Sequence, residues 1–312
     1  GHPEEHHHHR CWPCRYRQNL SGGGGGGGIS ANDALLIVYA PLGSTVAATK
    51  DGVTKTSTQG IALGDRPTVE MHLISIGSSL FGTWAVTATR GTDTNSTTIA
   101  VNAVQRYELY IGYHVPIDVY QEVEFIQSTG TQYLNLNLTA NQSTSFEIDF
   151  MSMAAQSYNP VLAFGRNNQA NAKRGNFASE QTGFNAWFNN VSKTIVSPYT
   201  ISTYKDKLTG GFSSSGLSAT VSHNGATYSY SESYTPSTMD YVYLCYATNG
   251  SSGTQFGHYK VYYFKILNGD TVQRELFPCY RLSDSVAGMY DKSNGVFYTN
   301  AGSGTFTVGA DV

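Results

Sequence analysis

Charged residues are scarce in this chain of 312 residues, because Asp, Glu, Lys and Arg make up 13%, about half of the usual share of roughly 25%. The net charge is −3, and no cluster of Lys and Arg follows the first 20 residues. A nucleic-acid surface needs clustered cations that displace counterions from phosphates, so we expect no nucleic acid partner. No apolar run approaches the roughly 18–20 residues that a membrane-spanning helix needs, so we also expect no membrane insertion.

Cysteine is scarce too, with four residues in the chain. Cys11 and Cys14 form a Cys-Trp-Pro-Cys unit beside the histidines at positions 6–9, which is a combination found in metal and redox sites. A zinc site needs a second ligand pair in an ordered scaffold, and here a run of seven glycines, Gly22 to Gly28, follows instead. Glycine loses the most entropy on ordering. We therefore expect residues 1–30 to be a disordered leader with a poly-Gly linker.

The residue types that are abundant in this chain indicate β-structure. The chain has 22 Tyr and 33 Gly, and short β-prone runs alternate with turn signals throughout, without a helical pattern longer than a turn or two. This composition is typical of β-sandwich proteins that work outside the cytoplasm and of virion proteins. The start of the chain lacks the apolar segment of a signal peptide, which favours release within a phage particle. The expected localisation is a virion or the cell surface.

The first domain, residues 31–116, shows about seven short strands and is predicted to be an Ig-like β-sandwich. Asp51-Gly52 lies between two β-prone runs, which is a strong hairpin signal. The segment 82–89 alternates cleanly and places Trp84 in the core. Residues 90–95 are predicted to be a turn, and the strand after them begins near position 98.

The second domain, residues 121–312, is predicted to be a larger antiparallel sandwich or jelly roll. Phe146, Ile148 and Phe150 alternate toward one face. Asn224-Gly225 and Asn268-Gly269 predict tight hairpin turns, and a strand over residues 241–246 is apolar on both faces.

Two segments far apart in the sequence carry a family resemblance. They are Phe125-Ile-Gln-Ser-Thr-Gly-Thr-Gln-Tyr-Leu134 and the closing run that contains Gly288-Met-Tyr-Asp291 and Asn294-Gly-Val-Phe-Tyr-Thr-Asn300. Together they resemble the first and last strands of the laminin-G-like/concanavalin A-like sandwich domain of phage tail or bacterial surface proteins. The resemblance implies a non-catalytic module used in adhesion, often to glycans. It predicts that the strand around 125–134 lies in the same sandwich as residues 288–306.

A glycosidase with this fold would need two carboxylates facing each other across the sugar. The nearest candidates are Glu147 and Asp149, which share the polar face of one strand and have no third carboxylate after them. We interpret them as a solvated strand face, so we predict no catalytic residues and no enzyme activity.

Candidate ligand contacts lie in two loops that combine an aromatic ring with amide and guanidinium donors. They are Arg166, Asn167, Trp187 and Asn189. The alternative is that Trp187 or Phe188 belongs to the core and that the asparagines form turns. No cofactor is predicted. Calcium, which some laminin-G modules bind, has Asp291 and Asn294 as candidate ligands, although turn chemistry alone explains an Asp at this hairpin.

These observations predict a non-catalytic structural or adhesive protein, a phage or prophage tail-associated component that contacts host surface glycan or another virion protein. A homo-oligomer is compatible with this function. The alternative is a bacterial cell-surface adhesin with the same modules. A third class, a glycan-cleaving enzyme, lacks the expected carboxylate pair.

Overall fold

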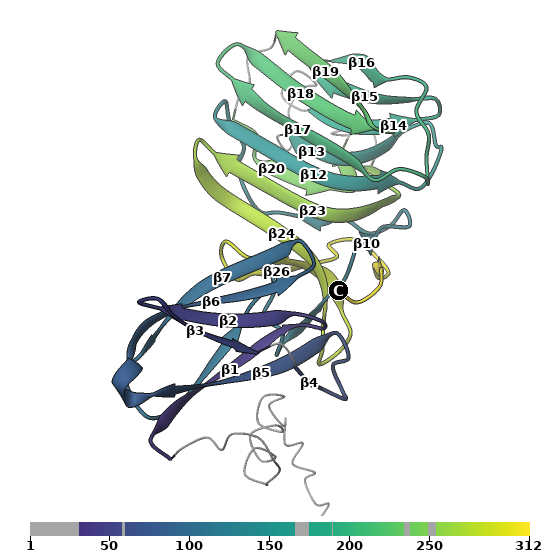
Figure 1. The fold of residues 1–312 in the computed structure, drawn as a ribbon. Helices are drawn as coiled ribbons and strands as arrows, with labels where there is room; N and C mark the ends of the chain where they lie inside the picture. The colour runs from purple at the N-terminus through teal and green to yellow at the C-terminus, as the bar shows by residue number, and fades with distance from the viewer. Residues whose placement is uncertain (1–30, 58–59, 166–174, 189, 234–237, 249–253) are drawn as a thin grey trace, which may run out of the picture. The chain divides into compact units, whose positions relative to one another are not determined.

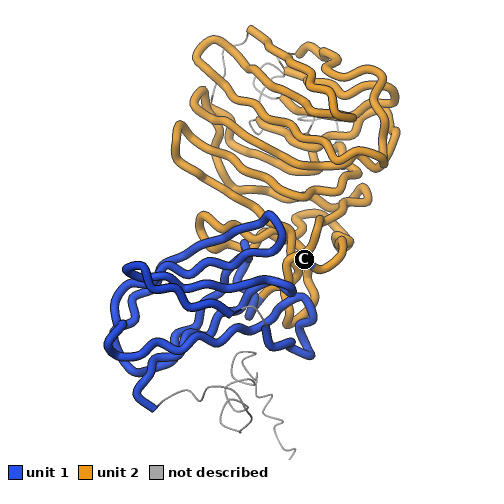
Figure 2. Tube along the Cα trace, in the orientation of Figure 1, with its two compact units in different colours: residues 1–119, 312 blue, residues 120–311 orange. Residues whose placement is uncertain are grey.

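The computed structural model describes residues 31–57, 60–165, 175–188, 190–233, 238–248 and 254–312. Within these ranges the chain is all-β, and its one helix is a short 3₁₀ turn, η2 (Ser78–Leu80). The chain divides into two compact units, residues 1–119 with Val312 and residues 120–311 (Figure 2). The predicted leader, residues 1–30, including Cys11 and Cys14, lies outside the described residues.

The first unit is a sandwich of two four-stranded sheets (Figure 1). One sheet has the order β4 (Ile61–Ala62), β5 (Val69–Gly77), β1 (Asp33–Pro41), β8 (Arg106–Tyr110). The other has the order β3 (Val53–Ser57), β2 (Thr45–Lys50), β6 (Gly82–Arg90), β7 (Asp93–Val101). Strand β1 runs antiparallel to β5 and parallel to β8.

Trp84 lies in the core of this sandwich, as the alternation of its strand predicts. Its side chain is fully buried, and its indole Nε1 donates a hydrogen bond of 3.1 Å to the carbonyl of Leu80. The hairpin at Asp51 and Gly52 is also confirmed, because both residues have the positive φ that a type I′ turn demands.

The predicted turn over residues 90–95 is too long. The structure has a two-residue turn at Gly91 and Thr92, and β7 begins at Asp93, opposite Arg90. Gly91 has a φ of 60°, and a glycine at the first turn position lets a two-residue hairpin close without recruiting strand residues. The polar run that suggested a loop is an exposed strand.

The second unit is a larger sandwich, with an eleven-stranded sheet on one side (Figure 1). Its main order is β19 (Ala226–Ser233), β18 (Gly216–His223), β17 (Asp206–Ser213), β12 (Thr144–Ser152), β23 (Tyr259–Asn268), β24 (Thr271–Arg281), β25 (Ala287–Asp291), β26 (Phe297–Thr299). Three short strands complete it: β9 (Tyr120–Glu122), β10 (Ile126–Gln127) and β27 (Thr307–Val308).

A six-stranded sheet forms the other side of this sandwich. Its order is β11 (Leu134–Asn135), β20 (Tyr241–Leu244), β13 (Asn159–Gly165), β14 (Gly175–Glu180), β15 (Gly183–Phe188), β16 (Val191–Val196). A separate hairpin, β21 (Tyr246–Thr248) and β22 (Thr254–Phe256), follows β20.

Phenylalanine rings from both sheets fill the space between them. Phe146 and Phe150 of β12, on the predicted inner face, lie 5.3 Å from Phe164 and 5.4 Å from Phe184 between ring centroids. Such pairs contribute about 0.5–1.5 kcal/mol each beyond the burial of their area. The six-stranded sheet is therefore held firmly on its inner face, which leaves its outer face available for a site.

The two ends of this unit meet, as the sequence comparison of its first and last segments predicted. Strand β10 pairs antiparallel with β27, so that Ile126 lies opposite Val308. The backbone N–H of Tyr133 donates a hydrogen bond of 3.1 Å to the side chain of Asn300. The prediction that both segments belong to one sandwich is confirmed.

The hairpin predictions of this unit have different outcomes. Asn224 and Gly225 both have positive φ and form the predicted turn between β18 and β19. The turn predicted at Asn268-Gly269 is displaced by one residue, because Asn268 pairs with Thr271 and the turn is Gly269-Asp270. The loop that contains Asn294 and Gly295 is longer than a two-residue hairpin, because the last pair of β25 and β26 is Tyr290 with Phe297.

No helix in the described part of the chain has the length and apolar character that crossing a membrane would require.

Candidate functional site

The outer face of the six-stranded sheet carries a row of residues across four neighbouring strands. Cross-strand pairing places Ala163 of β13 between Tyr243 of β20 and Asn176 of β14, and Asn176 in turn lies opposite Trp187 of β15. Side chains alternate between the two faces of a strand. Since Phe164, Phe177 and Phe188 belong to the core, their neighbours in this row point away from it.

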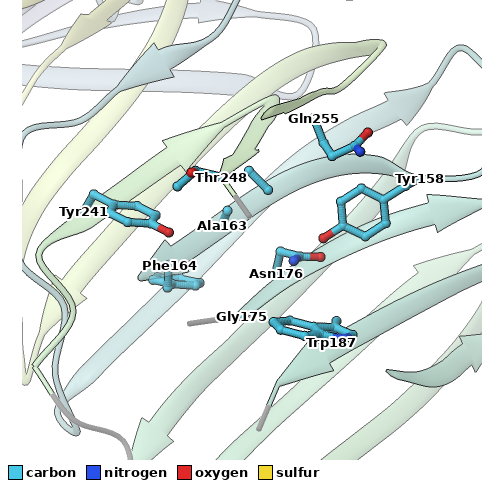
Figure 3. Close-up of a pocket in the computed structure, with 10 residues that line it drawn as sticks. Tyr158, Ala163, Phe164, Gly175, Asn176, Trp187, Tyr241, Thr248 and Gln255 are labelled. Carbon is cyan, nitrogen blue, oxygen red and sulfur yellow. The ribbon is translucent and has the colours of Figure 1, made fainter. Parts of the chain in front are cut away.

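A pocket with a volume of about 300 Å³ lies over this row. We call it the aromatic pocket, because the rings of Tyr158, Trp187 and Tyr241 stand around it (Figure 3). It is lined by Tyr158, Ala163, Phe164, Gly175, Asn176, Trp187, Tyr241, Ala247, Thr248 and Gln255. None of these described lining residues carries a charge.

The floor of the pocket is formed by residues with small side chains, which lie directly over the rings of the core. Gly175 lies opposite Phe188, and a Cβ at this glycine would lie 2.0 Å from the Phe188 ring. Glycine is therefore required at this point for the core ring to pack. Ala163 adds only a methyl group to the outer face, and the hollow lies between the larger side chains of Tyr241 and Trp187 (Figure 3).

Tyr158 is positioned by a hydrogen-bonded segment that enters β13. The side-chain Nε2 of Gln156 donates to the carbonyl of Tyr158 at 2.9 Å, to the carbonyl of Phe256 at 3.0 Å and to Oδ1 of Asn159 at 3.2 Å. Asn159 is itself fully buried and donates to Ser152 and Ser179. These bonds fix the segment between the two sheets, so this wall of the pocket is preformed.

The adjacent wall comes from the β21–β22 hairpin, since the carbonyl of Phe256 accepts the bond from Gln156. The run over residues 241–246, predicted as one strand, is interrupted at Cys245, whose φ of 62° is rare for a residue other than glycine. The backbone N–H of Cys245 donates to the carbonyl of Val161 at 2.9 Å. Gly257 follows β22, and its position would put a Cβ 2.0 Å from the carbonyl oxygen of Pro160. This close approach brings Thr248 and Gln255 to the pocket.

Asn176 is the distinctive polar group of the pocket. Its side chain is 5% exposed, and its Oδ1 is buried without a hydrogen-bond partner among the described residues. A buried acceptor without a partner costs about 1–3 kcal/mol, and such groups are rare in folded proteins. The floor of the aromatic pocket therefore contains an amide oxygen whose hydrogen-bonding capacity is unused within the described residues.

Further aromatic residues continue from the pocket. Tyr241 stacks on Tyr243 with ring centroids 4.4 Å apart, and Tyr133 stacks on Tyr246 at 4.2 Å. Burial raises the pKa of both Tyr243 and Tyr246, with further contributions from neighbouring tyrosines. Their hydroxyls therefore stay neutral at physiological pH.

The predicted contacts have separate outcomes. Trp187 is partly exposed and lines the pocket, whereas its neighbour Phe188 is fully buried in the core. Of these two aromatic residues, only Phe188 therefore belongs to the core. Arg166, Asn167 and Asn189 lie outside the described residues. Asn176, Tyr158 and Tyr241 carry no signal in the sequence, since only the register between strands brings them beside Trp187.

The candidate calcium ligands hold their own loop together. Oδ1 of Asp291 accepts hydrogen bonds from the backbone N–H of Glu275 and Ser293 and from the Ser293 hydroxyl, and Oδ1 of Asn294 accepts from the N–H of Val296. In the ranges that the structure describes, no three or more His, Cys, Asp or Glu residues gather as a metal site.

The candidate catalytic pair, Glu147 and Asp149, shares one partner. Both carboxylates form ion pairs with Lys207 of the neighbouring strand β17. This arrangement is that of charged residues on an outer strand face, the interpretation that their alternation favoured.

Comparison with known proteins gives only remote structural likeness. No family model matches the chain, and no curated protein matches it. A solved structure from Bacteroides ovatus, described as a "putative carbohydrate binding protein", aligns with 86% of this chain and 80% of its own, at 8% identity and a TM-score of 0.43. Identity and TM-score are both too low for anything about this chain to follow from that likeness.

Proposed function

We propose that this protein is a non-catalytic carbohydrate-binding protein, and that the aromatic pocket on the outer face of the six-stranded sheet is its binding site. The observation that carries the proposal is Asn176, whose buried Oδ1 has no partner in the described chain and faces a pocket between Trp187, Tyr158 and Tyr241. These rings and this acceptor together match the two kinds of surface that a sugar presents.

The chemistry of the pocket favours a neutral ligand with both apolar and hydroxyl surfaces. The C–H-rich face of a sugar ring packs on an aromatic ring, while its hydroxyls need hydrogen-bond partners. Trp187 offers a partly exposed indole next to Asn176 on the paired strand. Gln255 and Thr248 add polar groups at the wall from the β21–β22 hairpin (Figure 3). A charged ligand would find no opposite charge among the described lining residues.

Binding is favoured over cleavage because a glycosidase needs two carboxyl groups across the scissile bond. The described residues of the aromatic pocket include no Asp or Glu. Glu147 and Asp149 lie on the other sheet and are paired with Lys207. A reducing-end assay after incubation with polysaccharides should therefore show no cleavage.

The setting that we propose is a phage or prophage tail, where the second unit would belong to the laminin-G-like/concanavalin A-like sandwiches and contact host surface glycan or another tail protein. The first unit would serve as an Ig-like spacer. Pairing of β10 with β27, at the two ends of the unit, supports the family assignment. A bacterial surface adhesin is the alternative. Tail or lysis genes beside the coding gene favour the phage, and a sorting system favours the adhesin.

The binding proposal is tested with a glycan array followed by calorimetric titration of the glycans that bind. Trp187→Ala should lower the affinity at least tenfold, because it removes the ring on which the sugar packs. Tenfold corresponds to about 1.4 kcal/mol. Val191→Ala is the matched control, since Val191 is 44% exposed on the next strand and does not line the pocket. Its affinity should equal that of the wild type.

Two results would contradict the proposal. One is a wild-type protein that binds no glycan on a broad array. The other is a folded Trp187→Ala variant that binds as tightly as the wild type, which would move the site elsewhere.

A further inference from the structure

A second pocket lies beside the aromatic pocket. We call it the polar pocket, because its described lining residues are Ser157, Glu180, Gln181, Thr182, Gly183, Asn185, Thr194 and Ser197, without an aromatic or aliphatic side chain among them. Its volume is about 350 Å³. Glu180 is the one charged residue among those described there.

Both pockets lie on the same face of the sheet. On β15, Asn185 of the polar pocket precedes Trp187 of the aromatic pocket by two residues, so the two side chains point the same way. On β14, Asn176 lies opposite Trp187, and Ala178 lies opposite Asn185. Ahead of β13, the adjacent residues Ser157 and Tyr158 line one pocket each. The two pockets are therefore neighbours rather than separate sites.

Asn185 repeats the feature that distinguishes Asn176. Its side chain is 8% exposed, and its Oδ1 is buried with no hydrogen-bond partner in the described part of the chain. Asn176 and Asn185 are diagonal neighbours on paired strands, a relation that separates residues by about 7–8 Å. Two vacant acceptors thus face the same side of the sheet, one in each pocket.

Local backbone features keep the space around Asn185 open. The pairing of β15 with β16 shifts between Phe184 and Asn185, and such irregularities redirect side chains. Gly183 supplies no side chain on this face. A Cβ there would lie 3.2 Å from Oδ1 of Asn185 and 3.3 Å from Thr194, which is tighter than ordinary contact. A side chain at position 183 would crowd the Asn185 acceptor.

We infer that the ligand is an oligosaccharide that occupies both pockets, with one sugar unit on Trp187 and the next over Asn185. This inference rests on the proposed function. The two strand positions lie two residues apart, a separation of about 7 Å, so the second acceptor lies beyond a single ring stacked on Trp187. Asn176 accepts a hydrogen bond from a hydroxyl of the first sugar, and Asn185 accepts one from a hydroxyl of the second sugar. The lack of rings in the polar pocket means that the second unit is held by hydrogen bonds.

The test compares a monosaccharide with the matching di- and trisaccharide of a glycan that the wild type binds, by calorimetric titration. The disaccharide should bind at least tenfold more tightly than the monosaccharide. Asn185→Ala should lower disaccharide affinity about three- to tenfold, the range expected for one hydrogen bond, and leave monosaccharide affinity unchanged. Trp187→Ala should weaken both ligands.

Controls keep the outcomes distinct. Asn95→Ala removes an exposed strand asparagine of the first unit and should bind like the wild type. Asn185→Leu is the second variant, should Asn185→Ala unfold at a lower temperature. Equal affinities for mono- and disaccharide, or an unchanged disaccharide affinity in both Asn185 variants, would overturn the extended site and leave the aromatic pocket as a binding site for one sugar. A wild type that binds no glycan at all would overturn the proposed function itself.

Discussion

Replacing Asn176 by leucine should stabilise the protein and abolish glycan binding. Leucine is close to asparagine in size and shape, but it has no acceptor that needs a partner. At a position 5% exposed whose Oδ1 is unpartnered among the described residues, the replacement removes a polar group that the folded state leaves unsatisfied. An asparagine whose side chain is hydrogen-bonded within the fold would instead destabilise the protein when replaced by leucine.

The expected gain in the free energy of unfolding is about 1–3 kcal/mol, which is the cost of burying such a group without a partner. For a unit of this size, each kcal/mol raises the midpoint of thermal unfolding by roughly 2–4 °C. The melting temperature of Asn176→Leu should therefore rise by roughly 2–12 °C. Differential scanning calorimetry without ligand measures this shift, and glycan titration of the same sample measures the loss of binding.

Asn159→Leu is the matched control within the same sheet. Asn159 is buried, as Asn176 is, but its side-chain nitrogen donates to Ser152 and Ser179 and its Oδ1 accepts from the N–H of His258. Removing these bonds should lower the melting temperature. If Asn176→Leu is destabilised as Asn159→Leu is, then Asn176 already has a partner in the folded protein, and its role as a vacant acceptor for a ligand is refuted.

Two further predictions concern the two cores. Trp84→Ala should lower the free energy of unfolding of the first unit by about 3–5 kcal/mol, because it empties a fully buried site and removes the hydrogen bond to Leu80. Urea unfolding measures this loss. An equal loss in the control Leu42→Ala, whose residue is 51% exposed, would contradict the prediction. In the second unit, burial raises the pKa of Asp206, although Tyr199 and His223 bond to its carboxylate. The folded state then holds this proton more tightly than the unfolded state, so stability contributed by the protonated form is lost as the pH rises above about 4, the unfolded value. Urea unfolding between pH 3.5 and 7 should show the wild type losing stability relative to Asp206→Asn as the pH rises, and the opposite slope would refute the role of burial.

Several parts of the fold were predictable because they depend on neighbouring residues. Alternation in β6 and β12 identified the inward side chains Trp84 and Phe146, since side chains on a strand alternate whatever it pairs with. Asp51-Gly52 and Asn224-Gly225 form their turns because their φ preferences are local. The prediction of one continuous strand over residues 241–246 was wrong at Cys245. A cysteine does not favour positive φ by itself, and this conformation arises from the packing of β21 and β22 against β13.

The sequence by itself determined an all-β chain and its principal inward faces, because propensity, alternation and turn chemistry act over a few residues. The meeting of the second unit's two ends was predicted by the family resemblance of its first and last segments and not by local chemistry. The sequence also singled out Trp187 as a candidate contact. Only the tertiary structure decided that Trp187 faces a pocket while Phe188 enters the core, and that Asn176, Tyr158 and Tyr241 lie around it. The register between strands decides these juxtapositions, and a shift of one residue would send each side chain to the opposite face. The vacant acceptors of Asn176 and Asn185 belong to the same class, because whether a buried amide has a partner depends on every strand packed around it.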